Sequence, residues 1–160
     1  MVGRPNYDAE LIGMLEATVG CPAITTVGAE VAALTQAATK ELALLTLYPE
    51  QTTLMEKEYL EMTSPSLKVV SHRSLGMSSG LVIGDIEPMV AYRESRNIDT
   101  DHADALFLSG TNWRTVDVAR LIESDLGLPV FSANLVSMWA ALGRLGISGK
   151  TGYGSLLDQT

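Results

Sequence analysis

The sequence contains a single cysteine, Cys21, among its 160 residues. One thiol excludes an internal disulfide and a cysteine-rich metal centre, and a reducing, cytoplasmic setting is the simplest interpretation. The two histidines, His72 and His102, have no spacing that matches a metal site. We therefore expect no bound metal.

Basic residues are also few. Eleven lysines and arginines stand against 19 aspartates and glutamates, which gives a formal net charge of −8. Nucleic-acid binding calls for clustered Lys and Arg, so we expect no nucleic-acid partner. No apolar stretch reaches the length needed to span a bilayer, and residues 1–6 lack the apolar core of a signal peptide, so no membrane partner is expected either.

The composition is that of a packed domain, with 46% hydrophobic and 19% charged residues. Strand-like and helix-like patterns alternate along it. The expected strands are 22–26, 41–48, 67–75, 105–109 and 129–132. The expected helices are 7–18, 28–38, 49–62, 85–95, 113–126 and 134–145, with a Gly- and Ser-rich loop at 76–84 and a loop-like tail from 149 to 160. This alternation predicts an α/β fold with a parallel sheet covered by helices on both faces.

The predicted order of elements leaves one sheet edge without a partner, because the chain opens on a helix. An open edge is a liability for an isolated domain. Either a second copy of the chain covers it, which would make a homodimer, or sequence that normally precedes Met1 does so.

The segment 105–115 is the most informative part of the chain. An apolar run ends in the turn Ser109-Gly110-Thr111, and a helical pattern follows at once. In a parallel sheet such a junction places backbone N–H groups and a helix N-terminus at the carboxyl edge, where these folds bind anions. The simpler alternative is a structural turn, in which glycine relieves backbone strain and a hydroxyl caps the helix.

Tyr48 ends the predicted strand 41–48, just before Pro49. It is either a hydroxyl donor to a carboxylate at the same edge or a core or interface tyrosine. Cys21 precedes the predicted strand 22–26 and would lie at the opposite, amino edge as a buried, inert thiol. Four further polar residues could line the carboxyl edge, although helix capping explains the last of them equally well: Thr25, Thr26, Ser132 and Asn134.

Five short segments, in this order and spacing, resemble the arylmalonate decarboxylase and maleate isomerase branch of the Asp/Glu racemase superfamily. They are 44–48 (LLTLY), 73–76 (RSLG), 108–111 (LSGT), 128–132 (LPVFS) and 152–157 (GYGSLL). The likeness covers nearly the whole chain, and it corresponds to the later two-thirds of a usual family member.

The resemblance implies a two-lobed, pseudo-symmetric fold that works without cofactor or metal on a small dicarboxylate through an enediolate-type intermediate. It places the family's tyrosine on Tyr48, its second-lobe cysteine on Gly110 and the adjoining backbone donor on Thr111, while the first-lobe turn would lie just before Met1. It also implies a division into a remnant of the first lobe (1–40), an α/β lobe (41–145) and a tail returning toward the first lobe (146–160).

Three functions follow from these observations. The first is a cofactor-independent isomerase, racemase or decarboxylase in which Gly110 replaces the cysteine and no catalytic residue is assigned. The second is a degenerate homologue that binds a carboxylate or a partner protein without turnover. The third is an inert fragment that persists by dimerising over its open edge. In the first two, Tyr48, Ser109, Gly110 and Thr111 bind the small carboxylate ligand.

Overall fold

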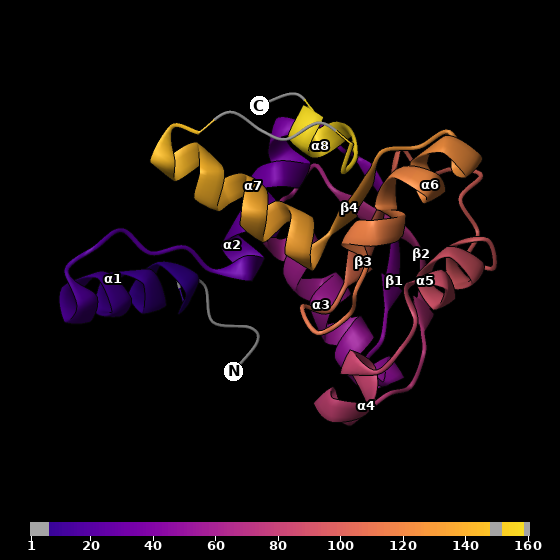
Figure 1. The fold of residues 1–160 in the computed structure, drawn as a ribbon, viewed down its shortest axis with the longest axis horizontal. Coiled ribbons are helices and arrows are strands. Elements are labelled where there is room, and N and C mark those ends of the chain that lie inside the picture. Colours follow the sequence, from indigo (N-terminus) through magenta and orange to yellow (C-terminus); the bar gives the residue numbers. More distant parts are fainter. Residues whose placement is uncertain (1–6, 148–151, 159–160) are drawn as a thin grey trace.

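A computed structural model describes residues 7–147 and 152–158. Its centre is a four-stranded parallel sheet in the order β2-β1-β3-β4 (Figure 1). The strands are β1 Glu41–Thr46, β2 Lys68–Ser74, β3 Ala105–Ser109 and β4 Val130–Ser132. The helices are α1 Tyr7–Val19, α2 Thr26–Gln36, α3 Glu50–Thr63, α4 Gly80–Gly84, α5 Pro88–Ser95, α6 Val116–Leu126, α7 Ala133–Leu145 and α8 Ser155–Asp158. The predicted α/β class is confirmed.

The two central strands form the core of the sheet. Every residue of β3 is buried, and so is every residue of β1 after Glu41. Continuous apolar runs such as ELALLT and ALFLS are typical of parallel strands that are covered on both faces. The helices supply that cover: α5 packs against α6 on one side, and α2 packs against α7 on the other (Figure 1).

The strand order has a consequence for function. From β1 the chain passes through α3 to β2 at one edge, whereas from β3 it passes through α6 to β4 at the other edge. The connections therefore diverge between β1 and β3. In open α/β sheets, the crevice outside the carboxyl ends of the strands at this topological switch point is where ligands bind.

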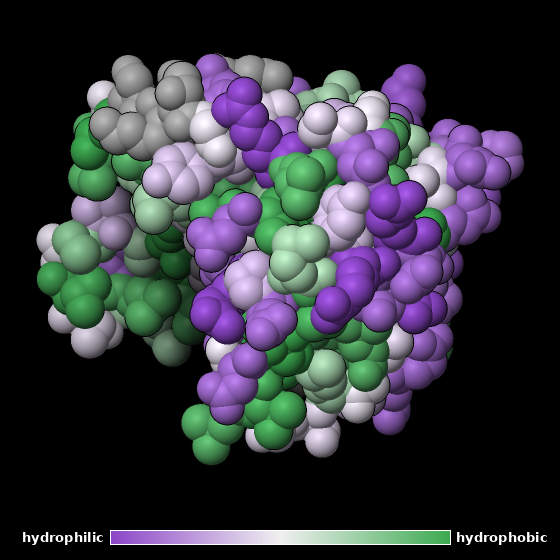
Figure 2. Space-filling view, turned by 45° about the vertical axis from the view of Figure 1, so that its right-hand side comes forward, coloured by the Kyte–Doolittle hydropathy of each residue, from purple (hydrophilic) through white to green (hydrophobic). Residues whose placement is uncertain are grey.

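Helix α1 stands apart from the sheet (Figure 1) and has no buried residue. Two polar contacts join it to the segment that leads into α2. The Thr25 hydroxyl donates to Asp8, and the Ala23 amide donates to Glu16 Oε1 at 3.0 Å. Its apolar side chains are exposed at the same end of the molecule as those of α7 (Figure 2), and they include Met14, Leu15 and Val19 of α1 and Met138 and Leu145 of α7.

The expected strand at 22–26 is wrong. The backbone of Thr25 is extended, but it acts as the N-cap of α2, and its hydroxyl accepts a hydrogen bond from the Gly28 amide at 3.0 Å. A threonine followed by small helix-forming residues satisfies the first turn of a helix, and that requirement prevails over β propensity here. Cys21 is exposed and not buried, because no strand follows to bury it.

Three boundaries also differ from expectation. Helix α6 begins at Val116, so six residues of turn separate β3 from it, and the helix does not start at once. Helix α4 lies within the expected loop 76–84. Helix α8 forms within the expected tail, where the Glu123 carboxylate accepts from the Ser155 amide and hydroxyl, and the rest of that tail (149–151 and 159–160) lies outside the described residues.

Candidate functional site

A cavity of about 500 Å³ opens at the switch point between β1 and β3. Tyr48, Ser109, Gly110 and Thr111, the four predicted ligand-binding residues, all line it. The other walls come from helices: Tyr7 and Asp8 of α1, Thr26, Val27 and Glu30 of α2, Thr52, Met55, Glu56 and Tyr59 of α3, and Ala133 of α7.

Strand register explains why these residues meet. Thr46, the last residue of β1, is paired with Ser109, the last residue of β3. The segments that leave these two strands therefore start side by side. A Cβ atom built on Gly110 would lie 3.8 Å from Tyr48 Oη and 3.1 Å from Leu47 Cδ1. Gly110 therefore lies beside the phenol, and a side chain at this position would contact Tyr48 Oη and crowd Leu47.

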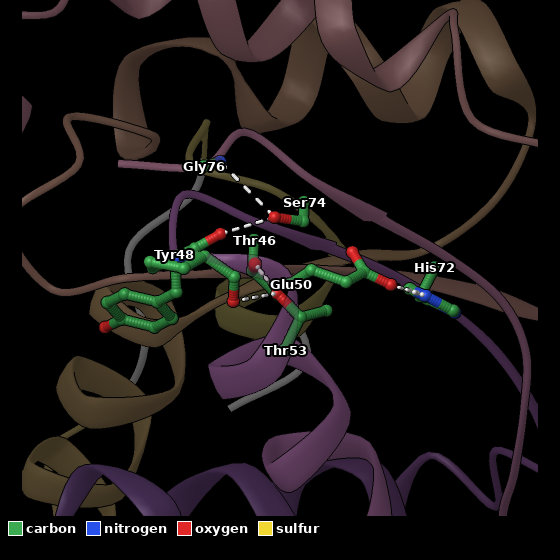
Figure 3. Close-up of polar contacts among 8 residues, drawn as sticks. Thr46, Tyr48, Glu50, Thr53, His72, Ser74 and Gly76 are labelled. Carbon is green, nitrogen blue, oxygen red and sulfur yellow. Dashed lines mark hydrogen bonds and ion pairs between the residues drawn. The ribbon is translucent and has the colours of Figure 1, made fainter. Parts of the chain in front are cut away.

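The backbone of Tyr48 is fixed by contacts from β2 (Figure 3). The Ser74 hydroxyl donates to the Tyr48 carbonyl at 2.6 Å, and the Gly76 amide donates to the same carbonyl at 3.2 Å. The ring extends away from these bonds and away from the hydrogen bond between His72 and Glu50, which has an Nε2–Oε1 distance of 2.7 Å (Figure 3). The phenol is therefore held toward the cavity by its own main chain.

Helix N-termini surround the cavity, but not that of the helix expected from the sequence. Lining residues lie in the first turns of α2, α3 and α7, namely Thr26, Thr52 and Ala133. The N-terminus of α6 contributes no lining residue. Since each helix N-terminus carries a partial positive charge, these three favour an anion in the cavity.

The polar residues that the sequence suggested for this edge divide into lining and structural roles. Thr26 lines the cavity, whereas Thr25 caps α2 behind it. Ser132 caps α7 by accepting from the Leu135 amide at 3.3 Å. Asn134 is not the cap; its side-chain amide donates to the Trp113 carbonyl at 2.7 Å.

Two glutamates in the cavity wall were not predicted from the sequence. Glu30 of α2 is only 5% exposed, and Glu56 lies on α3. The Oε1 atom of each is shielded from solvent and has no hydrogen-bond partner among the described residues. For Glu30 the sequence held a partial signal, because it is the only charged residue of α2 and follows Thr26 by one helical turn. Glu56 follows Thr52 in the same way, but that Thr52 lines the cavity is visible only in the structure.

The electrostatics of the cavity follow from these carboxyl groups. Burial raises the pKa of Glu56 from its ordinary value to about 7, although a hydrogen bond with Ser109 opposes the rise. Burial and the nearby charge of Glu56 raise the pKa of Glu30 well above its ordinary range. Burial, followed by the charges of Glu56 and Glu30, also raises the pKa of Tyr48, and a hydrogen bond with Ser109 again acts in the opposite direction. The carboxyl groups of the cavity are therefore more easily protonated than exposed ones.

No group of three or more His, Cys, Asp or Glu side chains suited to a metal ion occurs within 7–147 and 152–158. No helix in the same part of the chain is both long and apolar enough to cross a membrane.

The structure is that of an α/β protein with a cavity at the carboxyl edge of a parallel sheet, where such folds bind anions. Comparison with known proteins shows the family. Residues 3–157 match the arylmalonate decarboxylase family, and the chain belongs to it, within the arylmalonate decarboxylase and maleate isomerase branch of the Asp/Glu racemase superfamily. A maleate isomerase of Geobacillus stearothermophilus is 28% identical over 127 residues, which are 79% of this chain and 50% of that protein.

Solved structures agree on the fold. A maleate cis-trans isomerase of Nocardia farcinica, a cysteine-to-serine mutant with a covalently bound succinylcysteine intermediate, superposes with a TM-score of 0.89 at 24% identity, covering 99% of this chain and 67% of that one. A Pseudomonas putida maleate isomerase mutant with maleate gives a TM-score of 0.85 at 24% identity, covering 94% of this chain and 60% of that one. An arylmalonate decarboxylase also gives 0.85 at 24% identity, covering 99% and 71%. The chain thus spans about half the length of the maleate isomerase from Geobacillus stearothermophilus and 60–71% of these three structures.

Proposed function

We propose that this chain is a cofactor-independent isomerase-, racemase- or decarboxylase-like protein that acts on a small mono- or dicarboxylate through an enediolate-type intermediate. The observation that carries the proposal is the shared cavity of Tyr48, Ser109, Gly110 and Thr111 at the switch point. The relatives support it, since one structure contains maleate and another a succinylcysteine intermediate.

The geometry suits this chemistry because an enediolate gathers negative charge on a carboxylate carbon. Catalysis of such a step depends on preorganised donors and dipoles at the place where the charge develops. Three helix N-termini and the Tyr48 and Ser109 hydroxyls converge on the cavity, and they would stabilise both the bound carboxylate and the intermediate.

A second candidate is a carboxylate- or partner-binding homologue without turnover. It is favoured by the residues that line the cavity. By the family resemblance Gly110 occupies the position of the reactive cysteine, and Cys21, the only thiol, does not line the cavity and is exposed elsewhere. A glycine brings the backbone close to an anion, but it transfers no proton.

Calorimetry and isotope exchange separate the two candidates. Maleate, malonate and aspartate are titrated into the protein, with malonamide as a neutral control that lacks the carboxylate charge. Binding together with deuterium exchange at the α-carbon of the ligand in D₂O supports the enzyme. Binding without exchange supports the binding protein. If none of the acids binds better than the neutral control, both candidates fail.

Two organisational predictions remain proposals. The first is the division of the chain: we infer that residues 1–40 are a remnant of a first lobe, that 41–145 form the α/β lobe, and that 146–160 are a tail returning toward the first lobe. The second is that the chain forms a homodimer over its open sheet edge. Light scattering during gel filtration tests the dimer. A monomer that unfolds cooperatively would count against both the dimer and the interpretation of the chain as an inert fragment.

A further inference from the structure

The two glutamates of the cavity are an unusual feature for a site that favours anions. Glu30 projects from α2 and Glu56 from α3, and both line the cavity with a solvent-shielded, unpartnered Oε1 atom. Burying an ionised carboxylate without a donor is costly. A carboxyl group in that position is more stable when it holds a proton, because the neutral acid loses less on leaving water.

The described residues that line the cavity include no cation that could compensate the two carboxylates. The other titratable groups that line the cavity are Tyr7 and Asp8 of α1, Tyr48 after β1 and Tyr59 of α3, and no lysine, arginine or histidine is among the lining residues of the described chain. Asp8 accepts a hydrogen bond from the Thr25 hydroxyl. Ser109 also lines the cavity and lowers the pKa of Glu56, whereas Glu56 Oε1 has no hydrogen-bond partner among the described residues.

Like charges that share a site cannot both ionise freely. The charge of Glu56 acts directly on Glu30, and burial raises the pKa of both groups. Two carboxyl groups that interact in this way release their protons in steps that belong to the pair. This behaviour is consistent with a pair that still holds at least one proton at neutral pH.

We propose that Glu30 and Glu56 form a proton-holding carboxyl pair that couples carboxylate binding in this cavity to the uptake of a proton. The proposal rests on the proposed function and deepens it by naming the groups that determine which form of the site accepts the ligand. An ionised pair would repel the carboxylate of the ligand, whereas a protonated pair offers an O–H donor to that carboxylate. The incoming carboxylate therefore binds to the protonated pair. Where the pair is partly ionised, Glu30 and Glu56 take up a proton from solvent when the ligand binds.

The principal test is calorimetry with malonate between pH 7.0 and 8.5, where the ligand itself is fully ionised. Titrations at each pH are run in two buffers that differ in ionisation enthalpy, so that proton uptake appears as a difference in the observed heat. We expect uptake approaching one proton per malonate and a Kd that rises by up to about tenfold per pH unit. The Glu56→Gln variant, which replaces the acid with a neutral amide, should lose most of the uptake and bind about tenfold more tightly than the wild type at pH 8.5.

Glu58→Gln is the matched control, because it makes the same charge change at an exposed position of the same helix. This variant should keep both the proton uptake and the pH dependence of the wild type. A second measurement does not depend on ligand or variant: the carbon-13 carboxyl resonances of the labelled wild-type protein should include glutamate side chains that titrate near neutral pH.

The outcomes separate this proposal from the function on which it rests. Malonate binding without proton uptake, with an unchanged pH dependence in Glu56→Gln, overturns the carboxyl pair and leaves the carboxylate site standing. If no acid binds at any pH, the carboxylate site fails, and the carbon-13 titration still decides whether the pair holds a proton. Carboxyl resonances that all titrate in the ordinary acidic range would also overturn the pair.

Discussion

Thr46 and Ser109 are register partners at the carboxyl ends of β1 and β3, although 63 positions separate them in the sequence. The buried Thr46 hydroxyl lies 2.5 Å from that of Thr53, so the end of β1 is also tied to the first turns of α3. This arrangement brings Tyr48 beside the Ser109-Gly110 turn. The cavity is therefore a product of the sheet register and not of local sequence.

Replacing Tyr48 by phenylalanine should weaken carboxylate binding while leaving the fold intact. A hydrogen bond to a charged group contributes about 1.5–3 kcal/mol, which corresponds to a loss of roughly ten- to a hundredfold in affinity. The carbonyl contacts of Tyr48 are main-chain contacts and survive the change. Calorimetry with maleate measures the loss, and Tyr92→Phe on α5, which does not line the cavity, is the control. Equal affinities in the two variants would remove Tyr48 from the site.

The stability of the protein should fall as pH rises from about 4.5 to about 7. Glu56 has a pKa of about 7 in the folded protein and an ordinary value of 4.5, so within this window the folded state holds a proton that the unfolded chain has released. A pKa that is one pH unit higher in the folded state than in the unfolded chain corresponds to about 1.4 kcal/mol, so we expect Glu56 alone to contribute a decrease of roughly 2–4 kcal/mol over this window. Urea unfolding at several pH values measures it.

The Glu56→Gln variant should flatten much of this slope and be more stable than the wild type at pH 8. Glu58→Gln, exposed on the same helix, should retain the wild-type slope. Identical slopes in the two variants would show that another group produces the pH dependence.

Substitution of Gly110 should strain the backbone. Its φ is +132°, which L-residues rarely adopt, and the new Cβ would lie 3.1 Å from Leu47 Cδ1. We expect Gly110→Ala and Gly110→Cys to cost about 1–3 kcal/mol in the free energy of unfolding. Gly143→Ala in α7, which has open space and no positive φ, should be neutral or stabilising by up to about 1 kcal/mol. If Gly110→Ala were as stable as the wild type, the backbone at this turn would have to adopt another conformation.

Cys21 should react with iodoacetamide in the native protein, because it is exposed. Mass spectrometry should show one adduct, and the rate should approach that of the urea-unfolded chain. Maleate should give no protection, since Cys21 does not line the cavity. Slow native alkylation, or protection by ligand, would place the thiol in a different environment.

The sequence predicted all four strands of the sheet and part of the cavity, although it also predicted a fifth strand, at 22–26, that does not form. Apolar runs identify β1 and β3, and the residues that end them, Tyr48 and Ser109-Gly110-Thr111, could be assigned to one edge because parallel strands share their carboxyl ends. The carboxylates Glu30 and Glu56 were not found, since only the packing of α2 and α3 turns their side chains toward this edge. Thr25 was misassigned for a related reason: its backbone is extended, but it belongs to the start of a helix.

The wall of the cavity formed by Tyr7 and Asp8 differs from all the others in how it is supported. It belongs to α1, which buries no residue, and Asp8 is joined to the start of α2 through the hydroxyl of Thr25. The same hydroxyl accepts from the Gly28 amide, where a Cβ atom would come within 2.6 Å of Asp8 Oδ2. A methyl group added at position 28 would therefore crowd both the Asp8 carboxylate and the Thr25 hydroxyl, which lies 2.9 Å from the same Cβ position, so the contact that supports this wall would have to rearrange.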